Sequence, residues 1–240
     1  SFDEFESFTG VTNLSPGSYI GGIEENQGTF CKCSSLESIK LPDSITTIGA
    51  SCFASCTSLK KVIIPNGVKS IGRCAFVNTP NLDIVIPESV TSIYSRAFYN
   101  SGLSGDINLP NLTGSIEKEA TFQGSKITSV SNLGKITSVN GWYGANLGAF
   151  MDCKLLKKVV LPETITAINE ASFRGCTSLV AFICLATTPP TLVTSAFTST
   201  PISSKTGTIY VPDESVDAYK VATNWVDYSS IIKPLSEYVE

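Results

Sequence analysis

The residues best equipped for chemistry in this sequence are its cysteines, because the 240-residue chain contains no histidine. Cysteine thiols can act as nucleophiles, ligate metals or form disulfides. The absence of histidine excludes Ser-His-Asp and Cys-His catalysis, histidine-ligated metals and histidine-based pH sensing. The eight cysteines are Cys31, Cys33, Cys52, Cys56, Cys74, Cys153, Cys176 and Cys184.

Paired carboxylates, the groups that glycoside hydrolysis requires, are the second candidate for chemistry. The clusters are Glu24-Glu25, Glu117/Glu119 and Asp213-Glu214. None of them lies near a predicted strand end beside a second acid, so we interpret them as solvated loop acids. No Ser-x-x-Lys with supporting motifs and no glycine-rich phosphate loop is found. We therefore predict no enzyme, no catalytic residue, no metal and no cofactor.

The composition excludes further classes of function. Charged residues make up 16% of the chain, against about 25% in a typical soluble protein. The net charge of −4 argues against nucleic acid, which selects clustered lysine and arginine. No apolar run approaches the roughly 20 residues that cross a bilayer. The chain begins at Ser1 without a signal peptide, so we expect any signal or anchor segment to lie outside it.

A repeat must position these residues. Phenylalanines recur every 22 to 28 residues, at Phe30, Phe53, Phe76, Phe98, Phe122, Phe150, Phe173 and Phe197. A proline often follows twelve residues later, as Pro42 follows Phe30. Each unit carries too few apolar side chains to close a core alone, whereas stacked units bury them in continuous columns. The pattern predicts a stack of parallel coils.

One short strand in each unit alternates inward and outward side chains. Ile39 and Leu41 are predicted to point inward, and Ser38 and Lys40 outward, until Pro42 ends the strand. The outward positions should form two surface columns. The first is Lys40, Ile63, Val85, Asn108, Ser131, Val160, Ile183 and Tyr210. The second is Ser38, Lys61, Asp83, Asp106, Ser129, Lys158, Ala181 and Thr208.

Half of the cysteines also follow the repeat. Cys33, Cys56, Cys153 and Cys176 stand three residues after a periodic phenylalanine, where other units carry Ser or Thr. We interpret this position as a structural column of small, weakly donating side chains beside a turn. A disulfide between members in adjacent coils, such as Cys33 and Cys56, is an alternative. A zinc site formed by Cys31, Cys33, Cys52 and Cys56 is another, but Cys31-x-Cys33 is shorter than the usual ligand spacing.

The unit Phe-x-x-Cys-x-x-Leu-x-x-Val-x-Ile-Pro-x-x-Val-x-x-Ile-x-x-x-x-Phe resembles the BspA-like, or Treponema-type, leucine-rich repeat over residues 30 to about 212. The end of the chain, from Thr188-Pro-Pro-Thr to Trp225, resembles the finish of such proteins from Bacteroides-type gut bacteria. The resemblance implies a secreted or bacterial cell-surface protein that binds other molecules, for example in adhesion.

We predict a single domain over residues 1–240, a right-handed parallel solenoid of about eight coils of about 23 residues. Residues 1–29 should form an atypical first coil and loop, residues 30–212 the repeats and residues 213–240 a C-terminal cap with a short helix. The side chains expected to pack on the last coil are Val216, Tyr219 and Trp225.

Two surfaces are candidates for binding an extracellular protein or glycan. The first is the sheet face, with Ile63, Val85, Val160, Ile183 and Tyr210, which suits protein binding and adhesion. The second is a six-residue insertion holding Trp142 and Tyr143, whose rings would stack on sugars together with Tyr210. The blander interpretations are ordinary strand composition for the first, and a ring that plugs the widened coil for the second. A structural spacer without a ligand is the third hypothesis.

Overall fold

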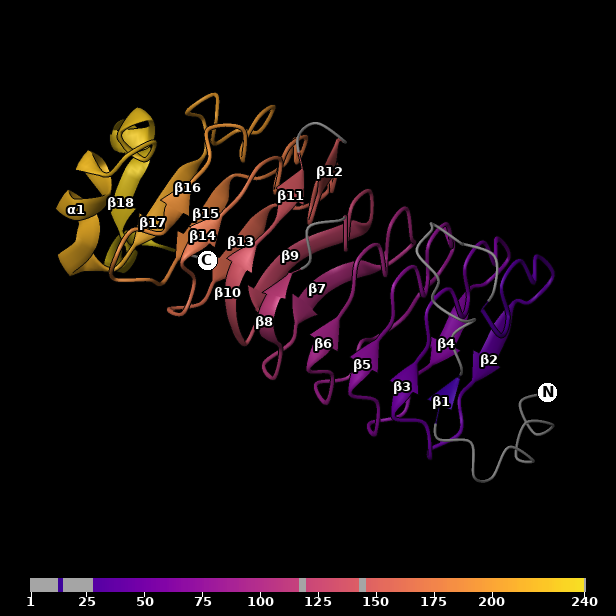
Figure 1. The fold of residues 1–240 in the computed structure, drawn as a ribbon. Coiled ribbons are helices and arrows are strands. Elements are labelled where there is room, and N and C mark those ends of the chain that lie inside the picture. Colours follow the sequence, from indigo (N-terminus) through magenta and orange to yellow (C-terminus); the bar gives the residue numbers. More distant parts are fainter. Residues whose placement is uncertain (1–12, 15–27, 117–119, 143–145, 240) are drawn as a thin grey trace.

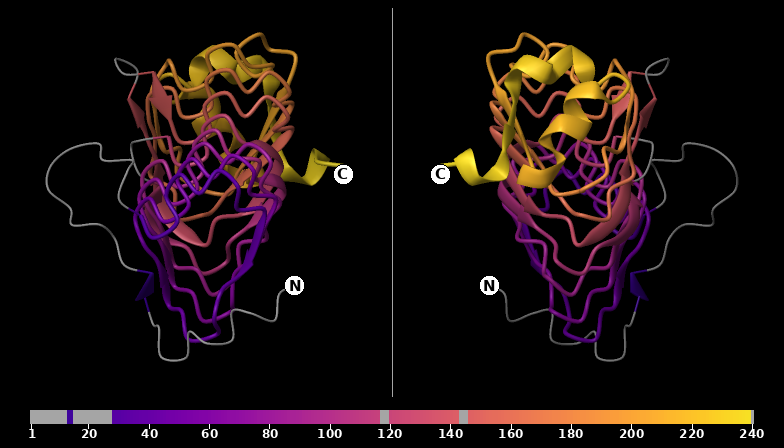
Figure 2. Two further views of the ribbon diagram at one scale, coloured as in Figure 1. Left: turned by 90° about the vertical axis from the view of Figure 1, so that its right-hand side faces the viewer. Right: turned by 90° about the vertical axis from the view of Figure 1, so that its left-hand side faces the viewer.

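The computed structural model describes residues 13–14, 28–116, 120–142 and 146–239. Over these residues the chain winds into a parallel solenoid of about eight turns, spaced about 23 residues apart. Figure 1 shows the turns following one another along the stack from the N-terminal to the C-terminal end. In the two views of Figure 2, which face the ends of the stack, successive turns overlap and rise from the N-terminal to the C-terminal end. The predicted repeat architecture is therefore confirmed.

One ladder of parallel strands forms the sheet face on which the predicted surface columns lie. Its strands are β2 (Ser38–Lys40), β4 (Lys61–Ile63), β7 (Ser104–Asn108), β9 (Lys126–Asn132), β13 (Lys158–Leu161), β15 (Ala181–Cys184), β17 (Thr208–Val211) and β18 (Ile232–Pro234). β2 pairs with β4, and the other six form one sheet. Between these two sheets, residues 83–86 join β4 through a single bridge from Lys61 to Asp83.

A second ladder runs along another side of the coils. Its strands are β1 (Asn13–Leu14), β3 (Thr47–Ile48), β5 (Ser70–Ile71), β6 (Ser92–Ile93), β8 (Thr113–Ile116), β10 (Lys135–Val139), β14 (Ala167–Ile168) and β16 (Thr191–Leu192). They form two four-stranded parallel sheets. The short hairpin of β11 (Gly141–Trp142) and β12 (Leu147–Gly148) completes the strands.

The register of the sheet face agrees with the predicted columns at the C-terminal end. Val160 pairs with Ile183, and Ile183 pairs with Tyr210. The prediction is wrong by one residue in the middle of the stack, where Asn108 pairs with Asn132 rather than with Ser131. The cause is a register shift between β7 and β9 at this point, a bulge that inserts one extra residue.

The periodic phenylalanines form one stacked column inside the solenoid. Successive ring centroids lie 5.1 to 5.8 Å apart, with interplanar angles of 2° to 16°. From Phe53 to Phe197 these rings are fully buried. The column ends where the ring of Tyr228, from the cap, meets Phe197 edge-on at 5.7 Å. The column thus runs through the core, which is continuous from Ile39 to Ile232.

Each phenylalanine is followed two residues later by a left-handed backbone conformation. The residues at this position have φ between 51° and 75° and are Lys32, Ser55, Asn78, Asn100, Gly124, Asp152, Gly175 and Ser199. Glycine, asparagine and aspartate adopt this conformation at the least cost. The tight corner after each phenylalanine therefore depends on a short polar residue or glycine at most of these sites.

The cap is built from α1 (Val216–Val221) and three 3-10 helices, at Asp213–Ser215, Val226–Ile231 and Leu235–Glu237. Tyr219 and Trp225 are fully buried against the last coil, and Val216 packs on the same core. In the part of the chain that the structure describes, no helix is long and apolar enough to cross a membrane.

Candidate functional site

The cysteine column bonds the backbone of the neighbouring coil. The thiol of Cys56 donates to the carbonyl oxygen of Phe30 at 2.9 Å. The thiols of Cys153 and Cys176 donate in the same way to Phe122 and Phe150, at 3.1 and 3.0 Å. These bonds fit a column of small donors beside a turn, because each thiol adds a second hydrogen bond to a corner carbonyl that already accepts a backbone amide.

Several buried cysteine thiols are unreactive near neutral pH. Burial raises the pKa of Cys153 to about 12 and that of Cys184 to about 11. Burial also raises the pKa of Cys176 well above its usual value. Such thiols stay protonated near neutral pH and are poor nucleophiles. Among the described residues, no group of three or more cysteines and acids is placed to hold a metal ion.

The sheet face carries exposed aliphatic side chains near the N-terminal end of the stack. Ile63 is 38% exposed and Val85 is 82% exposed. Val160 and Tyr210, farther along, are partly exposed. We call Ile63, Val85, Val160 and Tyr210 the apolar strip. The strip is thus most exposed where it lies on β4 and on the non-strand segment 83–86.

Ile183 does not belong to this surface, and the prediction that it does is wrong. Its side chain is only 4% exposed. The ring of Tyr238 lies 5.0 Å from that of Tyr210, and Lys158 Nζ lies 5.9 Å from the Tyr238 centroid. Ile183 lies on β15, which runs between the strand of Lys158 and the strand of Tyr210. Because Tyr238 contacts both flanking strands, we infer that its ring lies over β15. The cause is β18, which pairs with β17 and brings the last residues onto the sheet face.

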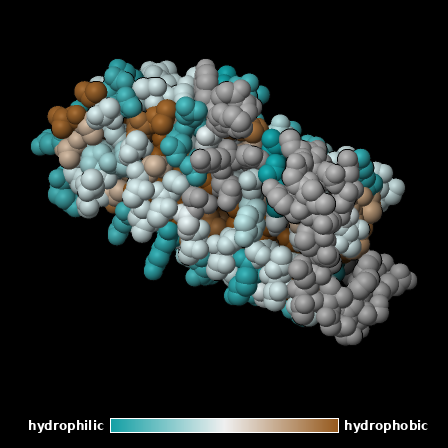
Figure 3. Space-filling model, viewed as in Figure 1, coloured by the Kyte–Doolittle hydropathy of each residue, from teal (hydrophilic) through white to brown (hydrophobic). Residues whose placement is uncertain are grey.

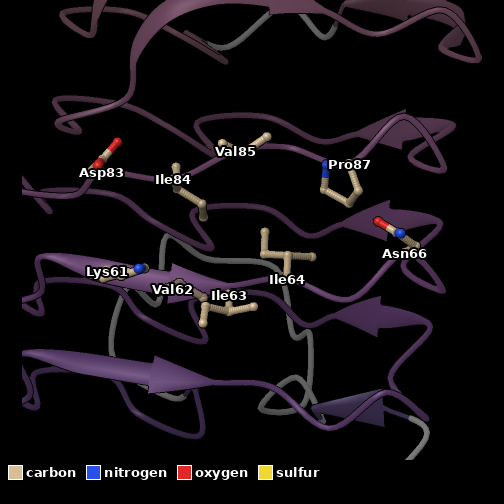
Figure 4. A pocket seen from close by; sticks show the side chains of 9 residues that line it. All are labelled: Lys61, Val62, Ile63, Ile64, Asn66, Asp83, Ile84, Val85 and Pro87. Carbon is tan, nitrogen blue, oxygen red and sulfur yellow. The ribbon is translucent and has the colours of Figure 1, made fainter. Parts of the chain in front are cut away.

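A hollow of about 410 Å³ adjoins the exposed end of the strip. Figure 4 shows Ile63, Ile64 and Val85 around its middle, with Lys61 and Asp83 toward one end and Asn66 toward the other. The hollow lies where β4 and the segment 83–86 share only one bridge. An apolar floor with polar ends suits an apolar side chain of a partner protein, with a backbone amide or another polar group of that partner at the ends of the hollow.

A second hollow of about 420 Å³ lies at the corner that follows β9 and β13. Its lining includes Val160 of the strip together with Gly134, Lys135 and Glu163. The corner between Leu133 and Ile136 is one residue shorter than the corner between Leu161 and Ile165.

The insertion folds as a hairpin. Gly141 pairs with Gly148, and Trp142 pairs with Leu147, in antiparallel register. The side chain of Trp142 and the whole of Tyr143 lie outside the described residues. Figure 3 shows hydrophobic surface at the C-terminal end of the stack. Val221 and Val226 of the cap are exposed.

Asn140 anchors the start of the hairpin. Its side-chain amide donates to the Ile116 carbonyl at 2.9 Å, and its side-chain oxygen accepts from Asn169 at 2.6 Å. Because both partners would lose their bond in a buried site, Asn140→Ala should lower the free energy of unfolding by about 1–3 kcal/mol. Chemical denaturation measures this, with the exposed Asn108→Ala as control. A loss equal to that of the control would contradict the anchoring role.

Comparison with known proteins identifies the family of the repeat. A family model described as the BspA type leucine-rich repeat region matches six copies over residues 24–143 and 145–217. The chain belongs to this family. The BspA-type repeats therefore cover nearly all of the solenoid, and proteins built from leucine-rich repeats are generally protein-interaction modules without catalytic activity.

Several solved structures are similar to this chain. A leucine-rich repeat protein of Bacteroides ovatus ATCC 8483 is 17% identical, with a TM-score of 0.45 over 95% of this chain and 70% of that one. A leucine-rich cell surface protein of Faecalibacterium prausnitzii A2-165 is 18% identical, with a TM-score of 0.40 over 94% and 83%. A leucine-rich repeat protein of Eubacterium ventriosum ATCC 27560 is 14% identical, with a TM-score of 0.41 over 84% and 72%. A search of curated proteins finds no match.

Proposed function

We propose that this BspA-type repeat protein is a non-catalytic binding module that holds a partner protein on its sheet face. The observation that carries the proposal is the exposed pair Ile63 and Val85 beside the hollow of about 410 Å³. The pair offers aliphatic surface on a scaffold whose coils are held by parallel ladders. A rigid, preformed apolar surface binds with little ordering cost.

The C-terminal end of the apolar strip is covered by Tyr238, which limits the part of the sheet face that a partner protein can contact. Tyr238 lies over β15, so Ile183 offers no surface to a partner. A partner protein would therefore contact β4, the segment 83–86 and the hollow between them, and would reach toward Val160. The polar ends of the hollow, Lys61 and Asp83, would orient it.

We propose an extracellular or bacterial cell-surface location and a role in adhesion for the same protein. The support is the low charged fraction of 16% and the repeat family itself. A neutral polar surface around a small apolar contact area fits recognition of other surfaces better than recognition of nucleic acid.

A charge placed in the strip should remove binding and leave the fold intact. Ile63→Asp and Val85→Asp should each weaken capture of an extracellular matrix protein at least tenfold, because the carboxylate would be desolvated in the complex. Surface plasmon resonance on a panel of such proteins measures the effect. Val221→Asp, on the exposed part of the cap, is the matched control. Equal binding by all three variants would refute the sheet-face site.

A glycan array, run beside the protein panel, decides between the other two hypotheses. A glycan array hit that is lost in Trp142→Ala would make this a carbohydrate-binding module that uses the β11–β12 hairpin. Binding to neither proteins nor glycans would favour a structural spacer. Circular dichroism of each variant would verify that the solenoid is intact.

A further inference from the structure

Two cysteines in adjacent coils converge on one carbonyl oxygen. The amide nitrogen of Cys33 donates to the Phe30 carbonyl at 3.1 Å. The thiol of Cys56, one coil later, donates to the same oxygen at 2.9 Å. The Cys56 sulfur is therefore directed toward the turn that holds Cys33, and the two residues occupy the same position of successive coils. Stacked neighbours of this kind lie in the Cα range that a disulfide spans.

A second pair has the same arrangement and provides an internal control. The amide of Cys153 and the thiol of Cys176 both donate to the Phe150 carbonyl, at 3.2 and 3.0 Å. The difference is access, because Cys33 is exposed whereas Cys153 and Cys176 are fully buried. Thiol exchange requires that a reagent reach the attacking sulfur.

We infer that Cys33 and Cys56 form a disulfide in an oxidising environment, and that this bond staples the first repeat coil to the second. The oxidant is a disulfide, either of a thiol–disulfide oxidoreductase or of low molecular mass, written RSSR. The inference does not depend on the proposed binding function, although an extracellular location would supply the oxidising conditions.

The reaction balances as two thiol–disulfide exchanges. The Cys33 thiolate attacks one sulfur of RSSR, forms a mixed disulfide and releases the first RS⁻. The Cys56 sulfur then attacks the Cys33 sulfur, which closes the protein disulfide and releases the second RS⁻. The protein loses two electrons, RSSR gains them, and the two cysteine protons end on the released thiolates. The order follows from access, because the exposed thiol meets the reagent first.

The closing exchange, in which Cys56 is the attacking group, should depend on pH. Burial, together with the neighbouring Cys33 and Cys31, raises the pKa of Cys56 to about 11. The thiolate fraction of Cys56 therefore grows about tenfold for each unit of pH below that value, so closure should be about ten times faster at pH 8 than at pH 7.

The experiment is oxidation of the full chain with glutathione disulfide, followed by alkylation in denaturant, trypsin digestion and mass spectrometry. Trypsin separates the relevant thiols, because Cys33 lies in the peptide 33–40 and Cys56 in the peptide 41–60. Cys31 lies in a third peptide that ends at Lys32. The inference predicts a cross-link between 33–40 and 41–60, located at Cys56 by fragmentation. The control pair in peptides 136–154 and 175–205 should be fully alkylated.

The melting temperature provides a second readout of the disulfide. The oxidised chain should melt about 5 °C or more above the reduced chain, because the bond closes a loop in the unfolded state. Cys33→Ser, at an exposed site, should fold and should lose both the cross-link and the shift. Full alkylation of Cys33 after oxidation, a bond from Cys33 to Cys31 or Cys52, or a bond between Cys153 and Cys176 instead would overturn the inference. An unchanged melting temperature with the cross-link formed would overturn the stapling role.

Discussion

Replacing Phe76 with alanine is expected to lower the free energy of unfolding by about 3–5 kcal/mol. The ring is fully buried and stacks between Phe53 and Phe98, at centroid distances of 5.3 Å on both sides. The coils on either side are held by backbone hydrogen bonds, for example from Phe53 N to Ala75 O. The backbone cannot close over the missing ring, so the cavity remains and its cost is added to the lost burial.

Chemical denaturation followed by circular dichroism measures the loss for Phe76→Ala. Phe76→Leu, which fills most of the space, should lose clearly less. Tyr94→Ala, at an exposed aromatic outside the column, serves as the matched control. A loss below about 1 kcal/mol for Phe76→Ala would show that the ring does not carry the stack.

Trp225→Ala should have an effect of similar size, about 3–5 kcal/mol, at the other end of the structure. The indole is fully buried, packs edge-on against Tyr219 at 4.9 Å and donates from Nε1 to the Pro190 carbonyl at 2.8 Å. Its removal opens the last hydrophobic layer of the solenoid to water, and a solenoid depends on such a shield.

Hydrogen exchange can separate this end effect from a general loss of stability. In Trp225→Ala the amides of β17 and β18 should exchange much faster, whereas those of β9 should change little. Trp225→Phe, which keeps most of the apolar contact and loses the hydrogen bond, should cost about 1 kcal/mol. The exposed neighbour Val226→Ala is the control. Uniformly faster exchange along the chain would contradict the capping role.

The repeat could be predicted because the same physical demand recurs in every coil. A ring at each periodic phenylalanine, such as Phe122, must be buried, and the alternation at Ile39 and Leu41 sets which strand positions face inward. The packing of Tyr219 and Trp225 on the last coil followed from the need to shield the end of the stack. These features depend on local spacing, which a sequence displays directly.

The errors arise where contacts are long in range or where the period slips. Ile183 is buried by Tyr238, which lies beyond the repeat and reaches the sheet face only because β18 adds to β17. The bulge that pairs Asn108 with Asn132 depends on how two neighbouring coils align. The left-handed corners were missed, although Asn78, Asn100 and Asp152 at that position are the residue types that signal them.

The candidate site was only partly predictable for a related reason. Alternation identified Ile63 and Val85 as outward residues, but not the hollow between them. The hollow lies beside the segment 83–86, which has a single bridge to β4. This unit differs in spacing from its neighbours, because Pro87 follows Phe76 by 11 residues rather than 12, but such a difference does not by itself predict a hollow.

Photo-crosslinking can show whether a partner protein binds the sheet face. Benzoylphenylalanine replaces Val85, Trp142 or Val221 in separate preparations, and each is irradiated with a matrix protein that the unmodified chain binds. We expect a covalent adduct from position 85, on the sheet face, and none from position 142 on the hairpin or position 221 on the cap. Adducts from position 142 or 221 without one from position 85 would contradict this expectation.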